Sequence, residues 1–479
     1  MTFTDAGEIQ RADQLVVYEH GWQSWSPTAT YPAASTSPRP ADRAGQVMGY
    51  RPDKRLPEEG FQGEGLLAVA PTRGGPVRIW SASDPTREVA SIRARSVDGR
   101  LVVSADGPVT EVAVDAPGLD AALAAWADGA ARACGAGPVG SIPAVWCSWY
   151  QYFGGVTAAA VTENLGQARR LDLPIGVFQL DDGFSGDVGD WLSTSDRFGR
   201  PLDSVAGEIR AEGHRAGIWT APLLVGERSR IRAAHPGWLV GGADAGRNWG
   251  QHLHVLDVTH PDAAEHLATV FRRLSAWGFD YFKLDFLYAG ALPGRRRQDA
   301  SAIGAYREAL RLIRAATGPG ATLLGCGAPI LPSLGLVDAM RVGPDIAIHH
   351  EPLRSGDLSA PSGRGAAMTV RARAFQHGRF WVNDPDCLIA RAEMEGREEW
   401  AEVVERWGGL RASGDRLATL DAWGLETTRR LLTPSSPRPL VPTSDSGHEP
   451  VRGREAQASA DPPPETSKPS GSRTRPLIS

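Results

Sequence analysis

Long hydrophobic runs, an excess of positive charge and paired cysteines are all missing from this 479-residue sequence. No apolar run approaches the roughly 20 residues that cross a bilayer, so we expect no membrane partner. The formal net charge of −5 argues against a nucleic-acid-binding surface. The four cysteines show no CxxC spacing, which disfavours a disulfide framework or a zinc site. The N-terminal residues also lack the apolar core of a signal peptide, so we expect a cytoplasmic protein.

Tryptophan, by contrast, is abundant, with 15 residues against 8 tyrosines. Several tryptophans stand near expected strand ends, among them Trp149 in "VWCSWY" and Trp219 in "GIWTAP". Large aromatic side chains with a polar edge suit the C–H faces of sugar rings, although single tryptophans more often fill a core. The composition therefore favours a carbohydrate site.

The sequence divides into four regions. Residues 1–117 show short apolar runs separated by Gly, Pro and Asp, which predicts a small antiparallel, sandwich-like β-domain. An Ala-rich helix and linker follow over 118–142. Residues 143–432 alternate strand and helix patterns, and seven clear strands with a weaker eighth in "ERWGGLRASGDRL" predict an α/β fold, a (β/α)8 TIM barrel. Residues 433–479 are rich in Pro, Ser and charge, which predicts a low-complexity disordered tail.

Each expected barrel strand begins apolar and ends polar. The polar or otherwise distinctive residues at these ends are Asp181 and Asp182, Trp219, Lys283 and Asp285, Cys326, Arg341 and Asp345, and Asn383, Asp384 and Asp386. The C-terminal ends of all strands in a parallel barrel open onto one rim, where barrel enzymes keep their active sites. The sequence therefore predicts that these side chains converge.

The stretch "FDYFKLDFLY", residues 279–288, places Lys283 and Asp285 on the same face of one strand. The ammonium group would lower the pKa of Asp285 and keep it ionised. Arg341 and Asp345 are likewise expected on one face of a later strand. If Asp345 lay near Asp285, repulsion would raise one pKa and supply a proton donor, as glycoside hydrolysis requires.

Two other interpretations of these residues stay open. Lys283 and Asp285 could form a purely structural ion pair. The carboxylate-rich rim could also bind a divalent metal, and His349, His350 and Glu351 lie just beyond a strand. We favour carboxylate chemistry, with no metal and no organic cofactor.

Eight motifs, in order, resemble those of melibiase-type α-galactosidases, glycoside hydrolase family thirty-six, which shares a clan with family twenty-seven. They are "WCSWY", "QLDDGF", "GIWTAP", "VLDVTHP", "YFKLDF", "LLGCG", "RVGPD" and "NDPDCL". The segment "HGWQSWS" is similar to a motif of the family's N-terminal β-domain. The resemblance covers about residues 20–430.

The resemblance implies roles for particular residues. Asp285 is similar to the family's nucleophile and Asp345 to its acid/base. Other positions correspond to residues that bind or wall the sugar: Asp181, Asp182, Lys283, Arg341, Trp149, Trp219 and Cys326. Asp384 is expected to support the loop behind them without touching substrate.

The function implied is that of a retaining exo-α-galactosidase acting on terminal α-galactosides through a glycosyl-aspartate intermediate. The alternatives are a related α-glycosidase such as an α-N-acetylgalactosaminidase, a galactosyl-transferring enzyme, or a non-catalytic sugar-binding barrel. The expected partner is an α-galactoside oligosaccharide. A homo-oligomer is also open, because large members of the family use neighbouring subunits to shape the pocket.

Overall fold

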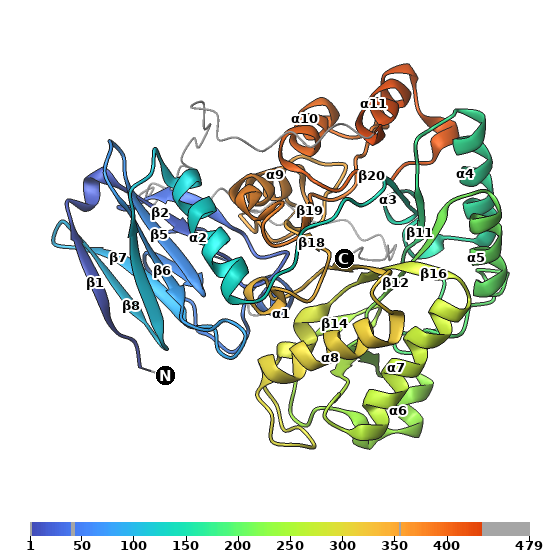
Figure 1. The fold of residues 1–479 in the computed structure, drawn as a ribbon, viewed down its shortest axis with the longest axis horizontal. Coiled ribbons are helices and arrows are strands. Elements are labelled where there is room, and N and C mark those ends of the chain that lie inside the picture. The colour runs from blue at the N-terminus through green and yellow to red at the C-terminus, as the bar shows by residue number, and fades with distance from the viewer. Residues whose placement is uncertain (1, 40–43, 354–355, 434–479) are drawn as a thin grey trace, which may run out of the picture.

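The computed structural model describes residues 2–39, 44–353 and 356–433. Figure 1 shows two parts, an N-terminal pair of β-sheets and a larger region in which strands alternate with helices. The tail predicted to be disordered, residues 433–479, lies outside the described residues except for Thr433. Among the helices described, none combines the length and the apolar character needed to cross a membrane.

The N-terminal part consists of two antiparallel sheets. One has the order β1 (Thr4–Gln10), β8 (Arg100–Ala105), β7 (Ser91–Val97) and β4 (Phe61–Glu64). The other has the order β3 (Ala29–Pro32), β2 (Leu15–Glu19), β5 (Leu66–Pro71), β6 (Val77–Ala82) and β9 (Val109–Val114). Alternating apolar side chains such as Val17, Val69 and Leu101 fill the core between the sheets. The predicted antiparallel β-region is confirmed.

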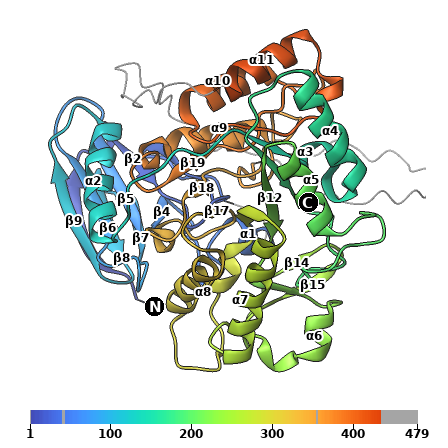
Figure 2. The same cartoon turned by 45° about the vertical axis from the view of Figure 1, so that its right-hand side comes forward.

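The second sheet is apolar on both faces, because Tyr18, Leu66 and Ile79 point away from the first sheet and join the main core. Helix α2 (Leu119–Ala133) covers this outer face with small residues including Ala122 and Ala127. Figures 1 and 2 both show α2 lying along the β5–β6 face. The helix expected over 118–142 thus packs against the sheet.

The larger part is built on one parallel sheet of eight strands. Their order is β10 (Val145–Cys147), β11 (Val177–Leu180), β12 (Arg215–Thr220), β16 (Phe279–Leu284), β17 (Thr322–Gly325), β18 (Ala339–Arg341), β19 (Val382–Asp384) and, beside β10, β20 (Ala412–Ser413). The sheet curls until its ends meet, since the backbone N–H groups of Gly409 and Leu410 both donate to the carbonyl of Asn383. The weak eighth strand is β20, and the TIM-barrel prediction is confirmed.

Amphipathic helices surround this barrel (Figure 2). They are α3 (Trp149–Tyr152), α4 (Ala158–Arg170), α5 (Leu202–Ala211), α6 (Arg230–Ala234), α7 (Pro261–Ala276), α8 (Ala302–Thr317), α9 (Gly363–Ala372), α10 (Arg397–Trp407) and α11 (Ala422–Leu432). Helix α7 shows why these segments fold so: Ala263, Leu267, Val270 and Leu274 recur at helical spacing and are buried. Side-chain caps such as Ser301, which accepts from the N–H of Gly304, begin several of the helices.

A small antiparallel sheet is inserted between β12 and α7. It has the order β13 (Leu224–Gly226), β15 (Gln251–Val255) and β14 (Arg247–Asn248), and it contains the extra short strand expected in "HLHVLDVTH". Residues 248–251 form its tight turn, where Trp249 and Gly250 both have positive φ, 49° and 68°. This pair of left-handed residues is typical of the turns that join twisted antiparallel strands.

The segment 21–26, "GWQSWS", leaves the N-terminal sheets and docks on the barrel beside the loop after β17. The N–H of Ser24 donates to Ala328 O at 3.0 Å, and that of Ile330 donates to Trp22 O at 3.0 Å. The guanidinium of Arg373 donates to four carbonyls of the segment, those of Gly21, Gln23, Ser24 and Ser26. Arg373 is fully buried. The short helix α1 (Ala44–Gly49) comes later in the N-terminal part, between β3 and β4. The two parts of the chain are therefore joined by polar contacts as well as by apolar packing.

Candidate active site

The side chains predicted for the site gather where the barrel strands end. Asp181 and Asp182 follow β11, Asp285 follows β16, and Cys326 follows β17. Side-chain contacts cross between these ends, as between Lys283 and Asp181, which are 102 positions apart. The strand ends thus bring together groups that are remote in sequence, as expected of a parallel barrel.

Asp285 is oriented by two neutral N–H donors. Its side chain is buried at 6% exposure. Nε1 of Trp219, on β12, donates to Oδ2 at 2.9 Å, and the backbone N–H of Phe286 donates to Oδ1 at 2.8 Å. Phe286 has a φ of 50°, a rare conformation for a bulky residue. The local backbone is therefore turned so that its N–H faces the carboxylate.

Lys283 makes its ion pair with Asp181, at 2.9 Å between Nζ and Oδ2, and not with its strand neighbour Asp285. Strand register aligns Lys283 with Trp219 on the concave inner face, so the lysine stem can cross the interior to β11. Burial works against the charged lysine, but Asp181 and, next, Asp285 raise the pKa of Lys283 well above its ordinary value. Of the two interpretations, the purely structural ion pair between Lys283 and Asp285 is wrong, because the lysine pairs with Asp181.

Asp181 accepts hydrogen bonds on both oxygens. Besides Lys283, Oδ2 accepts from Gln179 Nε2 at 2.6 Å and from the Cys147 thiol at 3.3 Å. Oδ1 accepts from the backbone N–H of Asp182 at 2.9 Å. With 1% exposure, Asp181 holds the rim together more than it faces outward.

Asp182 is more exposed than its neighbour Asp181, although only 9% of its surface is accessible. Burial raises its pKa to about 6, against hydrogen bonds from Trp249 and Gly183 that lower it. Nε1 of Trp249 donates to Oδ2 at 2.8 Å, and the N–H of Gly183 donates to Oδ1 at 2.7 Å. No cation contact to Asp182 is found among the described residues.

Trp249 was missed by the sequence reasoning because it lies in the β14–β15 turn, far from any barrel strand end. Its ring centroid lies 6.3 Å from that of Trp219 and 5.0 Å from that of Phe286. A bulky residue with positive φ in a turn costs on the order of 1–3 kcal/mol and is found where the surrounding structure requires it. A tryptophan within the polar turn "RNWG" was the available signal.

Arg341 contacts three carboxylates at once. Nη1 lies 2.9 Å from Asp345 Oδ1, Nε lies 3.2 Å from Asp384 Oδ2, and Nη2 lies 2.7 Å from Asp386 Oδ1. The expectation that Arg341 and Asp345 share a strand is wrong, because β18 ends at Arg341 and Asp345 lies in the following loop. The loop nevertheless returns the Asp345 carboxylate to the guanidinium.

Asp345 is the partly open member of this group, with its side chain 34% exposed, whereas Asp384 and Asp386 are buried. Although part of the side chain is exposed, desolvation of the carboxyl by the surrounding rim raises the pKa of Asp345; the charges of Asp285 and Asp181 raise it further, and those of Arg341 and Lys283 lower it. Asp345 is therefore a carboxyl group suited to hold a proton.

Aromatic side chains pack around Trp219 and Phe286, the two residues that donate to Asp285. Trp219 packs edge-on to Trp191 with ring centroids 5.6 Å apart, and Trp25, from the docked N-terminal segment, lies 5.0 Å from Phe286. Trp149 instead packs on Phe153 at 5.2 Å. Cys326 is fully buried, and burial followed by the charge of Asp285 raises the pKa of its thiol.

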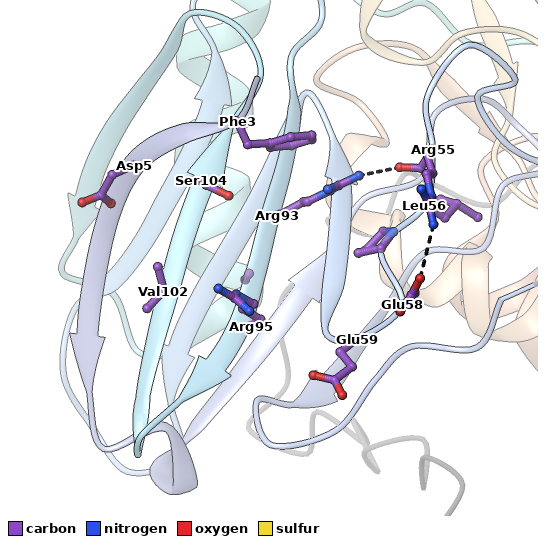
Figure 3. A pocket seen from close by; sticks show the side chains of 12 residues that line it. Phe3, Asp5, Arg55, Leu56, Glu58, Glu59, Arg93, Arg95, Val102 and Ser104 are labelled. Atoms are coloured by element: carbon purple, nitrogen blue, oxygen red, sulfur yellow. Dashed lines mark hydrogen bonds and ion pairs between the residues drawn. The ribbon is translucent and has the colours of Figure 1, made fainter. Parts of the chain in front are cut away.

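An open cavity lies away from this site, on the outer face of the β1–β8–β7–β4 sheet (Figure 3). It measures about 810 Å³ and is bordered by Phe3, Arg93 and Glu59. The guanidinium of Arg55 pairs there with Glu58 at the surface, and the Arg93 guanidinium lies 3.9 Å from the Phe3 ring centroid. This open cavity does not share the buried, converging carboxylates of the barrel rim. Among the described residues no group of three or more His, Cys, Asp or Glu is placed to bind a metal ion.

Comparison with known proteins places the chain in a family. A family model described as Melibiase matches residues 143–309. α-Galactosidase 2 of Pediococcus pentosaceus is 27% identical over 153 residues, which cover 30% of this chain and 21% of that relative. The match thus spans only about a fifth of this curated relative.

The similarity to solved structures is broader. The α-galactosidase TtGalA of Thermus thermophilus, in complex with p-nitrophenyl α-D-galactopyranoside, is 30% identical, with a TM-score of 0.76 over 90% of this chain and 87% of that chain. The chain belongs to the melibiase family. The fold of this melibiase-family protein is shared with AgaA of Geobacillus stearothermophilus, at 14% identity and a TM-score of 0.59 over 89% of this chain and 61% of that chain.

Proposed function

We propose that this melibiase-family protein is a retaining exo-α-galactosidase, with Asp285 as nucleophile and Asp345 as acid/base. The observation that carries the proposal is the contrast between the two carboxyl groups. Asp285 is suited to attack because each of its oxygens accepts a hydrogen bond, from Trp219 Nε1 or from the backbone N–H of Phe286, and these bonds orient the carboxylate. Burial raises the pKa of Asp345, which favours a protonated acid. Retaining glycoside hydrolysis requires one carboxylate that attacks and one protonated carboxyl group that acts as the acid.

In the first step, an Asp285 oxygen attacks the anomeric carbon while Asp345 gives its proton to the leaving oxygen. The glycosidic C–O bond breaks and a covalent glycosyl-aspartate forms. In the second step, Asp345, now ionised, takes a proton from water, whose oxygen displaces Asp285 from the anomeric carbon. Two displacements at one carbon retain its configuration.

The sugar is held, in this proposal, by the β11–β16 side of the rim. Asp182 has no cation contact among the described residues and accepts from sugar hydroxyls, while Asp181 acts mainly through Lys283. The N–H groups of Lys283 not used by Asp181 donate to a ring hydroxyl. Trp219 and Trp249 border the sugar with indole rings, whose faces pack well on C–H groups.

Arg341 and Asp384 take supporting roles. Because three nitrogens of Arg341 contact carboxylates, we assign it to orienting Asp345 and not primarily to the sugar. Asp384 accepts from Arg341 and from the N–H of Asp386, which fits the supporting role expected of it.

The relatives support a galactoside substrate. TtGalA was solved with p-nitrophenyl α-D-galactopyranoside and also with stachyose. We extend this to the present chain and propose a terminal α-galactoside of an oligosaccharide as its substrate.

The test is release of nitrophenol from α-galactoside, α-N-acetylgalactosaminide, α-glucoside and β-galactoside, with and without chelator. We expect turnover of the α-galactoside, unaffected by chelator and lost in Asp285→Ala. Turnover of the N-acetylated sugar alone would favour an α-N-acetylgalactosaminidase. Loss of activity with chelator would favour a metal enzyme, and no turnover by folded protein would favour a sugar-binding barrel.

A further inference from the structure

We propose that Asp386, together with Tyr150, is a positioning residue that leaves the catalytic proton on Asp345. The inference rests on the function proposed above, because it takes Asp345 to be the acid/base. From the sequence, Asp386 was expected to converge on the rim with the other strand-end residues, without a particular role. It lies two residues beyond Asp384, the last residue of β19, in the "NDPD" turn, and it is fully buried.

The Asp386 carboxylate accepts three hydrogen bonds and forms one ion pair. Oδ1 lies 2.7 Å from Arg341 Nη2 and accepts from the backbone N–H of Cys387 at 2.7 Å. Oδ2 accepts from the backbone N–H of Ile346 at 2.9 Å and from the Tyr150 hydroxyl. Arg341 and the two backbone N–H groups can only donate, so these three contacts favour an ionised Asp386, and the Tyr150 hydroxyl donates to it as well. Asp345, by comparison, accepts from Arg341 alone among the described contacts.

The charges of this group leave a proton to be placed. Asp345, Asp384 and Asp386 share one cation, Arg341. Burial raises the pKa of Asp386 to about 7, with Asp345 and Asp384 raising it and Arg341 lowering it, and burial also raises the pKa of Asp345. Near neutral pH the group therefore retains a proton, which belongs to the coupled carboxyl groups as a set. The hydrogen-bond arrangement places it on Asp345.

The groups that face the pair come from several elements. Tyr150 on α3, Cys387 beside Asp386 and the two residues Arg341 and Asp384 on β18 and β19 surround Asp386. Lys283, Asp285 and Asp181, from β16 and β11, act on Asp345. Lys283 and Arg341 both lower the pKa of Asp345. An ionised Asp386 offsets this effect, because its negative charge repels a second negative charge on Asp345 and so keeps the proton there.

Asp386 also fixes the loop that carries Asp345. Its Oδ2 accepts from the backbone N–H of Ile346, the residue next to Asp345, while its Oδ1 forms an ion pair with Arg341, which also contacts Asp345. The backbone of Asp386 has a φ of 96°, which only glycine adopts readily. Its own carboxylate stabilises this turn by accepting from the next N–H. The Asp386 side chain thus contacts both Ile346, which follows Asp345 in the sequence, and Arg341, which forms an ion pair with Asp345.

The experiment compares pH profiles of kcat/KM for Asp386→Asn and Tyr150→Phe with the wild type, on melibiose and on nitrophenyl α-galactoside. Removing the Asp386 charge ends its repulsion of Asp345 and frees Arg341 to act on Asp345, so Asp345 ionises at lower pH. We expect the basic limb for melibiose to move down by about one pH unit in Asp386→Asn. Tyr150→Phe should move it less, in the same direction, because Asp386 then competes better for the proton.

The leaving group separates this role from a structural one. Nitrophenolate leaves without a proton, so above the limb the loss should be up to about tenfold greater for melibiose than for the nitrophenyl substrate. Asp415→Asn is the matched control: Asp415 is also fully buried, with Arg391 at 2.9 Å, but contacts no group proposed for catalysis. It should lower the melting temperature and leave the basic limb in place.

Equal losses on both substrates with an unmoved limb would overturn the inference, even if stability falls. If Asp386→Asn does not fold, Tyr150→Phe gives the same readout with the carboxylate retained. Wild-type turnover of both substrates is measured first, so that an inactive wild type contradicts the proposed function, whereas an active wild type with unchanged variant profiles contradicts the inference alone.

Discussion

The two halves of the rim contain the same kinds of charge in different arrangements. Each half has one buried cation and three aspartates. In the first half these are Lys283 with Asp181, Asp182 and Asp285; in the second they are Arg341 with Asp345, Asp384 and Asp386. The lysine contacts one carboxylate, whereas the arginine contacts all three. The difference follows from the chemistry of the cations, a compact ammonium against a planar fork of five donors.

This comparison indicates how similar charges can serve different tasks. In the first half, Asp182 and Asp285 each accept hydrogen bonds from a tryptophan indole N–H and a backbone N–H. These bonds orient the two carboxylates without a direct cation contact in the described part of the chain. In the second half, the arginine binds the carboxylates to one another and only Asp345 stays partly open. The first arrangement suits attack and sugar binding, and the second suits storage of a proton.

The largest expected effect comes from removing one carboxylate from each half and comparing the products. Asp285→Ala should lower kcat by about 10⁴-fold or more, and Asp345→Ala by about 10²–10⁴-fold on melibiose. With the nitrophenyl substrate, whose leaving group needs no proton, added azide should rescue both variants. It should give β-galactosyl azide with Asp285→Ala, by direct displacement, and α-galactosyl azide with Asp345→Ala, by attack on the glycosyl-enzyme. Identification of the products by NMR checks the assignment, and reversed products would exchange the two roles.

The next effect concerns the single ion pair of the first half. Lys283→Met leaves Asp181 buried without its cation and should lower the free energy of unfolding by about 3–5 kcal/mol. Lys54 provides a matched control, since its Nζ lies 2.7 Å from Asp106 Oδ2 in the N-terminal part and the pair is similarly buried.

Lys54→Met should lose comparable stability and keep kcat/KM, while Lys283→Met should lose both. Denaturant unfolding and nitrophenyl galactoside kinetics measure the two quantities. If the folded fractions of both variants showed equal activity, the rim lysine would have no part in sugar binding.

The smallest effect concerns Asp182, whose buried charge has no cation contact among the described residues and should lower the free energy of unfolding. The pKa of Asp182 is raised to about 6 in the folded protein, against an ordinary value near 3.9 in the unfolded chain. Between these values the folded state binds more protons, so this group lowers stability progressively as pH rises from about 4 to 6. Asp182→Asn should therefore be more stable than the wild type by about 3 kcal/mol above pH 7, with little gain at pH 4.

The same variant should bind galactosides poorly. Melting temperatures at pH 4.5 and 8, measured on both proteins, check the pH dependence of the difference. A difference that is constant with pH would mean that the burial of a charge is not its origin.

Much of the fold could be predicted because apolar strands and amphipathic helices carry their own periodicity. Even the two-residue β20 was found from its neighbours, and the rim rule brought Asp285 and Lys283 to the right end of the barrel. Strand lengths were overestimated, since β18 stops at Arg341 and leaves Asp345 to a loop. Periodicity describes where a strand runs and not how the chain turns after it.

What could not be predicted depends on contacts between distant segments. Lys283 was paired with the nearer carboxylate in sequence, although barrel curvature brings Asp181 to it. Trp249 lies in a turn of an inserted sheet, and Asp386 in a turn with a positive φ. Neither position follows a regular pattern, so only the folded arrangement shows their hydrogen bonds.

The anchoring of segment 21–26 by Arg373 also bears on how the protein is made. The ribosome adds roughly 5–20 residues each second, and about 350 residues separate the segment from its anchor. Trp22 and Trp25 therefore emerge tens of seconds before the arginine that secures them. During that interval the Trp25 indole lacks Phe286 and Tyr288, the rings that pack on it in the folded protein, which makes this early stretch a natural place for chaperones to engage.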